Sequence, residues 1–366
     1  MKLHLYFARR YFITFMAVFL LFSIMAVLIG MIDKFRDMRG TEAGFIDVLG
    51  LTALDAPTAV YRILPLIALI SSVALYLNFA RSSELVITRA AGRSAVVSLI
   101  APVAMALILG GLAVAVLNPL VAATQKQYDL MAQRFLTGEV SVVSVSAEGL
   151  WMRQGSREGQ TVIRAEGANE DGTALRSVTF MTFGPTGELL SRADADSAEL
   201  SNGNWNLADA KIWDFSGQVS NPELNAKTAP SATLPSNLTP ERIRESFATP
   251  SRIAIWDMPG FITRLETAGF SARGHRVFLQ SELSLPLLLV AMVMIGAAFT
   301  MRHSRFGGTG MMVLMAIGMG FATYFIRNFA QILGENGQLP VALAAWAPAA
   351  AAILLAFSLI LHFEDG

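Results

Sequence analysis

Residues 11–32 read YFITFMAVFLLFSIMAVLIGMI and contain no charged side chain. A helix needs about 20 apolar residues to cross the hydrocarbon core of a bilayer, so this run is long enough. Basic residues precede it, as they also precede the apolar run of a signal peptide. That run is only about 7–15 residues long and ends at a small-residue cleavage site, whereas Asp33 and Lys34 follow here. The stretch therefore predicts an uncleaved first membrane helix.

Five further stretches lack charged residues and are long enough to form membrane helices. They are residues 63–80, 95–123, 283–301, 306–326 and 339–361. The composition agrees, because 54% of the 366 residues are hydrophobic and 15% are charged, against about 25% in a typical soluble domain. Three spans precede residue 124 and three follow residue 282. The sequence thus predicts an α-helical membrane protein with six transmembrane helices (3+3) and a domain inserted between them.

The inserted domain has the pattern of an all-β fold. Residues 150–153 and 160–166 flank a glycine-containing hairpin loop, and Asn202-Gly203 marks a second turn. Short strands with turn signals between them are typical of a sandwich, jelly roll or barrel-like sheet. Residues 221–240, rich in Pro, Ala, Ser, Thr and Asn, are expected to form a loop or linker. Residues 259–268 then predict a short helix that stops at Gly269.

The distribution of basic residues predicts the orientation. The positive-inside rule compares Lys and Arg in the short loops on the two sides of the membrane. One side has eight and the other has five: Lys2, Arg9, Arg10, Arg81, Arg89, Arg93, Arg302 and Arg305 against Lys34, Arg36, Arg39, Arg62 and Arg327. Both termini are therefore expected in the cytoplasm and the β domain in the opposite compartment.

Several classes of chemistry are missing from the sequence. With 28 basic and 28 acidic residues the net charge is zero, so no nucleic-acid partner is expected. There is no cysteine, no P-loop, no His-Glu-x-x-His and no histidine cluster, and hence no predicted metal or cofactor site. No charged pair is expected in the middle of a span. If the protein moves something uphill, its energy must come from a partner.

The loop between the second and third spans predicts a short amphipathic helix. It reads SSELVITRAAGRS from Ser82 to Ser94. Leu85, Thr88, Arg89 and Gly92 fall on one face at helical spacing. One interpretation is an interfacial helix that rests on lipid. The other is a coupling helix that docks on a cytoplasmic ATPase, with Ser83 and Glu84 at its start and the four residues of that face.

Cations near the expected far interface form a second candidate site. Lys34, Arg36 and Arg39 follow the first span, and Arg327 ends the fifth. They either snorkel and anchor the helix ends or bind phosphorylated lipid head groups. The fifth span also contains five glycines, which suit either tight helix packing or a helix that parts from its neighbour as a lateral gate. These glycines are Gly307, Gly308, Gly310, Gly318 and Gly320.

Five stretches carry a resemblance to a known family, namely residues 32–37, 83–94, 149–153, 236–242 and 275–299. The most specific one has Ser-Glu-Leu followed by Arg-Ala-Ala-Gly within 83–94. With them, the whole chain resembles the LptF/LptG permease family of the lipopolysaccharide export transporter, and its LptG branch more than its LptF branch.

The resemblance implies a non-catalytic half-transporter of the ABC class in the bacterial inner membrane. It would pair with an LptF-like paralogous permease, while a dimer of the LptB ATPase hydrolyses ATP. Lipopolysaccharide would leave the outer leaflet through a cavity between the first and fifth spans and enter a periplasmic β-jelly roll. LptC would receive it there. The implied domains are 1–136 and 251–366 in the membrane and 137–250 in the periplasm.

The resemblance also assigns residue roles. Glu84 and its helix neighbours would dock in the LptB groove, and Lys34 would face the phosphates of lipid A. Arg36 and Arg39 lie where relatives are also basic, whereas Arg327 rests on geometry alone. Three alternatives stay open: an LptF-type partner of the same complex, an intramembrane lipid-modifying enzyme, and a scaffold for a periplasmic complex.

Overall fold

The chain divides into two compact units. The computed structural model describes residues 2–38, 44–90, 92, 94–136, 142–146, 149–156, 159–169, 172–184, 186–216, 222–236, 238–239, 243, 249–301 and 309–365. The first unit comprises Met1–Met131, Ala254–Trp256 and Arg273–Gly366, and the second comprises Ala132–Ile253 and Asp257–Ala272. Six residues singled out in the sequence lie outside the described ones: Arg39, Arg93, Arg302, Arg305, Gly307 and Gly308.

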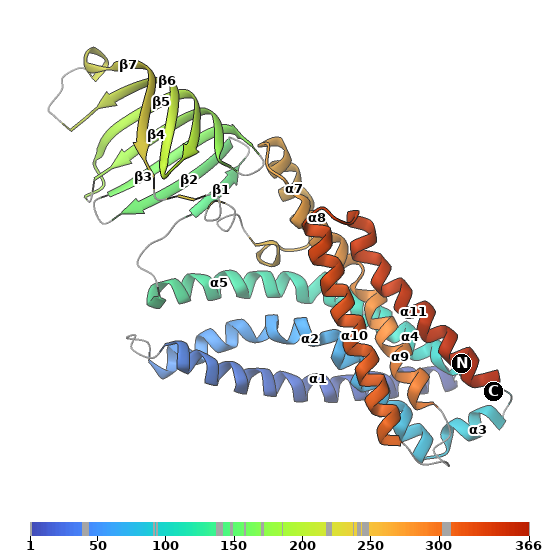
Figure 1. Cartoon of the computed structure of the whole chain (residues 1–366). Helices are drawn as coiled ribbons and strands as arrows, with labels where there is room; N and C mark the ends of the chain where they lie inside the picture. The colour runs from blue at the N-terminus through green and yellow to red at the C-terminus, as the bar shows by residue number, and fades with distance from the viewer. Residues whose placement is uncertain are drawn as a thin grey trace. The chain divides into compact units, whose positions relative to one another are not determined.

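The first unit is helical (Figure 1). Its elements are α1 (Lys2–Asp37), α2 (Phe45–Arg81), α3 (Glu84–Ala90), α4 (Ala95–Leu112), the π-helix η1 (Ala113–Leu117), α5 (Asn118–Leu136), α8 (Arg273–Leu283), α9 (Leu285–Thr300), α10 (Thr309–Glu335) and α11 (Val341–Asp365). Five stretches are long and apolar enough to span a membrane alone: Leu3–Asp37, Phe45–Arg81, Val96–Ala132, Thr309–Glu335 and Val341–His362. The pair α8 and α9, bent by 47°, makes a sixth if it counts as one span. The described helices thus confirm the predicted helical membrane protein.

Several helices are longer than the predicted spans. The 36 residues of α1 extend about 54 Å at 1.5 Å per residue, well beyond the roughly 30 Å of the hydrocarbon core. Helix α2 begins at Phe45, so the predicted span 63–80 covers only its second half. Helix α10 continues to Glu335, so Arg327 does not end this helix as expected. Charged residues that were expected in loops therefore lie on helices.

Helix α9 forms the core of the first unit. All but three of its residues are buried, and it contacts α2, α4, α10 and α11. Small residues permit the close approach: a Cβ added at Gly110 of α4 would lie 2.5 Å from the Cα of Pro286. The hydroxyl of Ser72 on α2 donates to the carbonyl oxygen of Val293 at 2.7 Å. Such small-residue contacts and interhelical hydrogen bonds stabilise helices in lipid.

The second unit contains a seven-stranded antiparallel sheet, drawn as one curved sheet in Figure 1. Its strands are β1 (Val142–Ser146), β2 (Gly149–Ser156), β3 (Gly159–Ala168), β4 (Ala174–Phe183), β5 (Leu189–Ser201), β6 (Asn204–Asp214) and β7 (Lys227–Pro235). The inserted all-β domain is confirmed. Within the described strands the order is a meander, in which each strand pairs with the next, without the Greek-key crossovers of a jelly roll.

The prediction of a loop or linker over 221–240 is wrong, because β7 lies within it. The Pro-rich composition misled the sequence analysis, since proline in a strand interior usually argues against a strand. Here β7 ends the sheet order as an edge strand, where proline is tolerated. Pro230 moreover lies opposite Asp209, whose φ is 50°, at a position where β6 and β7 form no pair although the register is the same on both sides of it.

The core of the second unit lines one face of the sheet. Its largest buried side chains include Met152, Phe180 and Trp205, and the rings of the last two lie 6.0 Å apart. Helix α7 (Met258–Thr267) follows the strands, and the chain turns at Gly269, whose φ is +94°. The predicted helix over 259–268 and its glycine stop are confirmed.

Candidate functional site

Lys34 lies where three helices meet. It occupies the last turn of α1, and its Nζ is 3.4 Å from Oδ2 of Asp55 on α2. The same ammonium lies 4.6 Å from the ring centroid of Tyr128 on α5. The Lys34 side chain is only 15% exposed. The charge that the sequence singled out is therefore balanced by a carboxylate and a ring of its own subunit.

An apolar cavity begins beside this ion pair. It has a volume of about 340 Å³ and lies between α1 and α2. Phe22, Ile29, Ala56 and Ile63 belong to its lining, which Asp55 shares. Asp33 lines it as well, and Lys34 stands beside it as the ion-pair partner of Asp55. The site therefore combines an apolar compartment with charged groups of both signs close to it.

The four predicted cations do not form one cluster among the described residues. Arg36 is exposed, and Arg39 lies outside the described residues. Arg327 on α10 interacts electrostatically with Glu282 and Tyr61 instead of joining Lys34. Asp55 and Tyr61 lie roughly 9 Å apart along α2 at 1.5 Å per residue. Helix α2 thus contacts Lys34 through Asp55 and interacts electrostatically with Arg327 through Tyr61.

A buried polar cluster, which the sequence analysis missed, surrounds Glu282. This carboxylate is 5% exposed, and its Oε2 accepts a hydrogen bond from the Tyr61 hydroxyl. The same oxygen accepts from Nδ2 of Asn118 at 3.1 Å. With Arg327 these residues come from α2, α5, α8 and α10. We call Tyr61, Asn118, Glu282 and Arg327 the polar hub.

The polar hub places one ionisable residue, Glu282, inside a candidate span that was expected to begin after it. The sequence placed the start of the fourth span at residue 283, just beyond Glu282. Helix α9 alone has 16 residues, about 24 Å, which is too short to cross the hydrocarbon core. The bent pair from Arg273 to Thr300 therefore includes Glu282 inside the candidate span. If Glu282 had been included in the fourth span, an ionisable residue within a span would have marked it as a candidate functional residue.

The short helix α3 begins beside two polar side chains. Ser83 has φ of 60°, and the hydroxyl of Ser82 donates to Oε1 of Glu84 at 3.0 Å. Arg10 on α1 interacts electrostatically with Glu84. Gly92 follows the helix with φ of +77°. The start of α3 is thus fixed by the hydrogen bond of its own turn.

The two faces of α3 differ in exposure. Leu85 and Thr88 are 4% and 6% exposed, so these members of the predicted docking face pack within the chain. Val86 and Ile87 are 42% and 67% exposed. The structure describes no side-chain position for Arg89. The apolar surface that α3 presents outward therefore consists of Val86 and Ile87, which the sequence analysis did not select.

Helices α1 and α10 have the smallest buried shares of the five single-helix spans. Leu20 on α1 is 61% exposed and Phe325 on α10 is 70% exposed. Of the glycines described on α10, Gly320 packs against Leu69, whereas an added Cβ at Gly310 or Gly318 meets nothing within 4 Å. These two helices offer apolar faces that lipid or another protein can cover.

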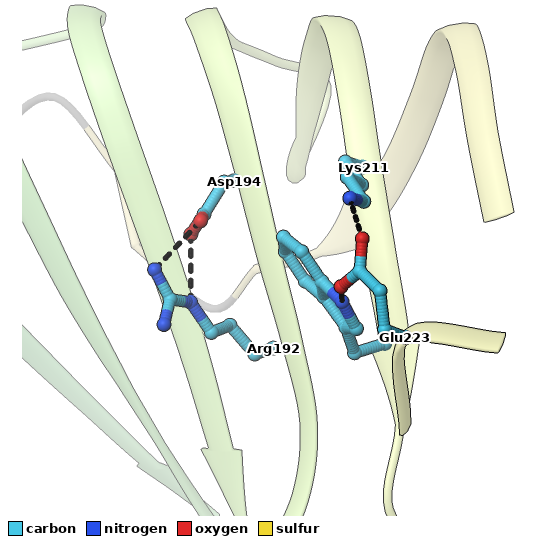
Figure 2. A network of polar contacts seen from close by, with 5 residues as sticks. Arg192, Asp194, Lys211 and Glu223 are labelled. Atoms are coloured by element: carbon cyan, nitrogen blue, oxygen red, sulfur yellow. Dashed lines mark hydrogen bonds and ion pairs between the residues drawn. The ribbon is translucent and has the colours of Figure 1, made fainter. Parts of the chain in front are cut away.

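A charged network crosses the polar face of the sheet. Arg192 donates to Asp194 through Nε at 3.0 Å and Nη2 at 2.7 Å, and Lys211 pairs with Glu223 of the 3-10 helix η2 (Pro222–Asn225), as Figure 2 shows. Nε1 of Trp213 donates to Glu223 at 2.8 Å. The hydrogen bond from Lys211 lowers the pKa of Glu223 below its ordinary value. The network fastens η2 to β6.

Comparisons with known proteins agree on one family. The sequence matches the model of a family described as "Lipopolysaccharide export system permease LptF/LptG" over residues 5–362. Two relatives from Escherichia coli, of strain K12 and serotype O6:H1, are named "Lipopolysaccharide export system permease protein LptG". Each is 24% identical to the chain over 360 residues, which covers 95% of this chain and 94% of the relative. That identity does not separate an LptG from an LptF subunit.

Proposed function

Because the chain belongs to the LptF/LptG family of lipopolysaccharide export permeases, we propose that it is an LptG-type subunit that extracts lipopolysaccharide from the inner membrane. One observation carries the proposal: the family match runs from residue 5 to residue 362 and so includes both the spans and the inserted sheet. The resemblance of residues 32–37 and the names of the two relatives support LptG over LptF. An LptF-type subunit is the alternative.

The proposed orientation places both termini in the cytoplasm and the sheet in the periplasm. The excess of basic residues on the side of the termini supports it. It also puts α3 in the cytoplasm, where an ATPase can reach it. The rim of the α1–α2 cavity, at the other end of α1, then lies toward the periplasmic leaflet.

The proposed partners fit the surfaces that the chain leaves uncovered. A paralogous LptF-like permease would cover the exposed faces of α1 and α10. Because lipid provides no hydrophobic driving force between helices, this contact would depend on close packing of the two surfaces. A dimer of the LptB ATPase would receive α3 through Glu84, Val86 and Ile87. The periplasmic sheet ends in the edge strands β1 and β7. LptC would take the lipid from this domain.

Lys34 has a defined part in the proposed extraction. Lipid A carries phosphates, and ammonium groups bind phosphate strongly. A phosphate at the rim of the cavity would compete with Asp55 for Lys34, while an acyl chain occupies the apolar lining. Exposure of acyl chains to water costs about 25 cal/mol per Å², so an apolar route onward lowers the barrier. The apolar face of the sheet, with Phe180 and Trp205, would supply such surface once these buried side chains are uncovered.

The proposal does not include an enzymatic reaction in this subunit. Its family consists of transporter permeases. ATP hydrolysis is assigned to the partner. Lipopolysaccharide is the cargo, and neither a cofactor nor a nucleic acid enters the scheme.

The test is purification of the tagged chain from its native membrane in mild detergent, followed by mass spectrometry. We expect an ABC ATPase, a second permease of the same family and lipopolysaccharide to copurify. Reconstitution of that complex in proteoliposomes should then release lipopolysaccharide to a soluble acceptor only when ATP is added. Recovery of the chain alone, under conditions that preserve other ABC complexes, would contradict the proposal.

A further inference from the structure

The side-chain amide of Asn118 joins two buried groups of the first unit. Its Oδ1 accepts from the backbone N–H of Ile255 at 3.0 Å, and its Nδ2 donates to Glu282 at 3.1 Å. Asn118 is 4% exposed and directly follows the π-helix η1. A π-turn inside a helix is uncommon and frequently accompanies a functional site. The chain segment at Ile255 is thereby tied to the fourth candidate span.

Glu282 lies at the point where α8 bends into α9. Its Oε2 accepts from both Asn118 and Tyr61, so one oxygen connects α8 with α5 and α2. Arg327 of α10 acts electrostatically on both Glu282 and Tyr61. No ion pair within 4.0 Å joins Arg327 to Glu282 among the described side chains. The buried Nε of Arg327 has no hydrogen-bond partner there.

The two kinds of contact hold the helices differently. The hydrogen bonds fix α2, α5 and α8 to one another at short range. At the level of Glu282, helix α10 is held to this group through charge at longer range and through packing such as that of Gly320 on Leu69. Its hydrogen bond to α8 lies near the end of α10, where Arg273 donates to the carbonyl oxygen of Gly334. Helix α10 is also, after α1, the single-helix span with the smallest buried share. Among the helices of the polar hub, α10 is therefore the one that can change position without breaking a hydrogen bond to Glu282.

Other polar contacts of α8 provide a comparison. Gln280 accepts from Nε1 of Trp346 on α11 at 2.8 Å, and Arg273 donates to the carbonyl oxygens of Gly334 and Leu339. These contacts also hold helices together, but they involve no buried carboxylate. A carboxylate within a span is energetically costly, so it usually has a functional role. Removal of one member of a buried pair of charges is also destabilising, because the other charge then lacks its partner.

We propose that Glu282 is a positioning residue of the transport cycle. Glu282 sets the position of α10 through Arg327, and it connects α10 to the Ile255 segment through Asn118. This inference rests on the proposed function, because it assigns the movement of α10 to the passage of lipid. The carboxylate and the guanidinium attract each other in the arrangement that the structure shows. Separation of α10 weakens that attraction, so the hub returns α10 after each release.

The experiment uses the complete reconstituted complex and measures three quantities on each variant. Spin labels on cysteines introduced at Leu49 of α2 and Phe329 of α10 report their distance, since the chain has no native cysteine. ATP hydrolysis and ATP-driven lipopolysaccharide release are measured on the unlabelled complex. The variants are Glu282→Gln, Arg327→Gln and the double variant. Gln280→Leu is the matched control, because it removes one hydrogen bond of α8 outside the hub.

We expect each single hub variant to broaden the distance distribution and to lower lipid release at least fivefold, with ATP hydrolysis within twofold of the wild type. The double variant should lose less than either single one, because it leaves no unbalanced charge. If Glu282→Gln fails to assemble, Tyr61→Phe removes one hydrogen bond of the hub and should likewise broaden the distance distribution.

Three results would overturn the inference. They are an unchanged distance and release in the assembled single variants, losses that simply add in the double variant, and equal losses in Gln280→Leu. A wild-type complex that releases no lipopolysaccharide would instead refute the proposed function. In that case a distance change in the single variants would still locate α10 under the control of Glu282, so the two failures are distinguishable.

Discussion

At the scale of single residues, the structure shows which side chains surround the cations that the sequence singled out. Lys34 was selected because a basic residue follows the first span, and its ion-pair partner Asp55 lines an apolar cavity. The sequence contained no sign of its partners, because Asp55 and Tyr128 are distant in the chain and belong to stretches that were expected outside the spans. Their helices had to be longer than the hydrophobic runs for the three to meet.

The Lys34–Asp55 pair predicts opposite effects of two substitutions. Lys34→Gln should weaken photocrosslinking of lipopolysaccharide about tenfold, because a charge-assisted hydrogen bond contributes about 1.5–3 kcal/mol and about 1.4 kcal/mol is a factor of ten. Asp55→Asn should strengthen it, since it frees the ammonium from a competing carboxylate. Arg36→Gln, at an exposed position, is the comparison. Equal crosslinking in all three variants would rule out a role of Lys34 in head-group binding.

Glu282 marks the limit of prediction at this scale. A hydropathy reading begins a span at the first residue of an uncharged run, and so it stopped one residue after the carboxylate. The bend between α8 and α9 adds the residues that complete the crossing. Pro286, in the first turn of α9, is a local signal for that bend, because proline has no N–H to donate to the carbonyl oxygen of Glu282 four residues earlier. A reading of hydropathy alone does not use it. No sequence pattern indicated that Tyr61 and Asn118 donate hydrogen bonds to Glu282.

At the scale of elements, hydrophobic runs and glycine turns predicted most of the helices and strands. The hairpin between β2 and β3 and the turn at Asn202-Gly203, where both residues have positive φ, agree with the sequence signals. Strand β7 was missed because its proline is acceptable only at an edge, and edge position is a property of the whole sheet. The outward face of α3 was missed for a similar reason. Periodicity shows which residues share a face of a helix, but not whether that face points toward the rest of the chain or away from it.

Helix α3 gives a prediction that separates its two faces. Glu84→Arg and Ile87→Asp should each abolish ATP-driven lipopolysaccharide release, because they change the charge or polarity of the outward surface, while membrane insertion stays normal. Thr88→Val should have little effect, since Thr88 is buried and its hydroxyl donates to the carbonyl oxygen of Glu84. The measurement is copurification of the ATPase together with lipid release. Loss of the ATPase only in Thr88→Val would instead place the docking surface on the inward face.

Two adjacent glycines test the packing of α4 on α9. Gly110→Ala should destabilise the first unit by about 1–3 kcal/mol, the usual cost of overpacking, because its Cβ would lie 2.5 Å from the Pro286 Cα. Gly111→Ala should leave stability unchanged or raise it slightly, since nothing lies within 4 Å of that position. Thermal unfolding of the two variants in detergent gives the comparison. Equal melting temperatures would contradict the close approach of the helices.

At the scale of the whole molecule, the 3+3 plan with an insertion followed directly from where the charges are absent. Hydrophobic run length is enough to count spans, because the bilayer imposes one thickness on every helix. Sidedness is a weaker inference, since it depends on a difference between eight and five basic residues. It is also the part of the plan that an experiment decides most directly.

Cysteine labelling of the otherwise cysteine-free chain tests sidedness. Leu224→Cys on η2 and Ile87→Cys on α3 introduce thiols at positions that are 83% and 67% exposed. A maleimide that cannot cross the inner membrane should label position 224 in cells with a permeabilised outer membrane. Position 87 should react only after the inner membrane is disrupted. The reverse pattern would invert the proposed orientation.

The division of the chain has a consequence for how such a protein can diversify. The segment Ala254–Trp256 belongs to the first unit, while the residues on both sides of it belong to the second. An ordinary insertion is joined to its host at two points and can be exchanged as a cassette. Here the backbone passes between the units four times, so excision of residues 132–253 would strand α7 with the apolar side chains of Ile262 and Leu265 uncovered. Recombination in this lineage should therefore preserve the stretch from 132 to 272 as a single inherited block.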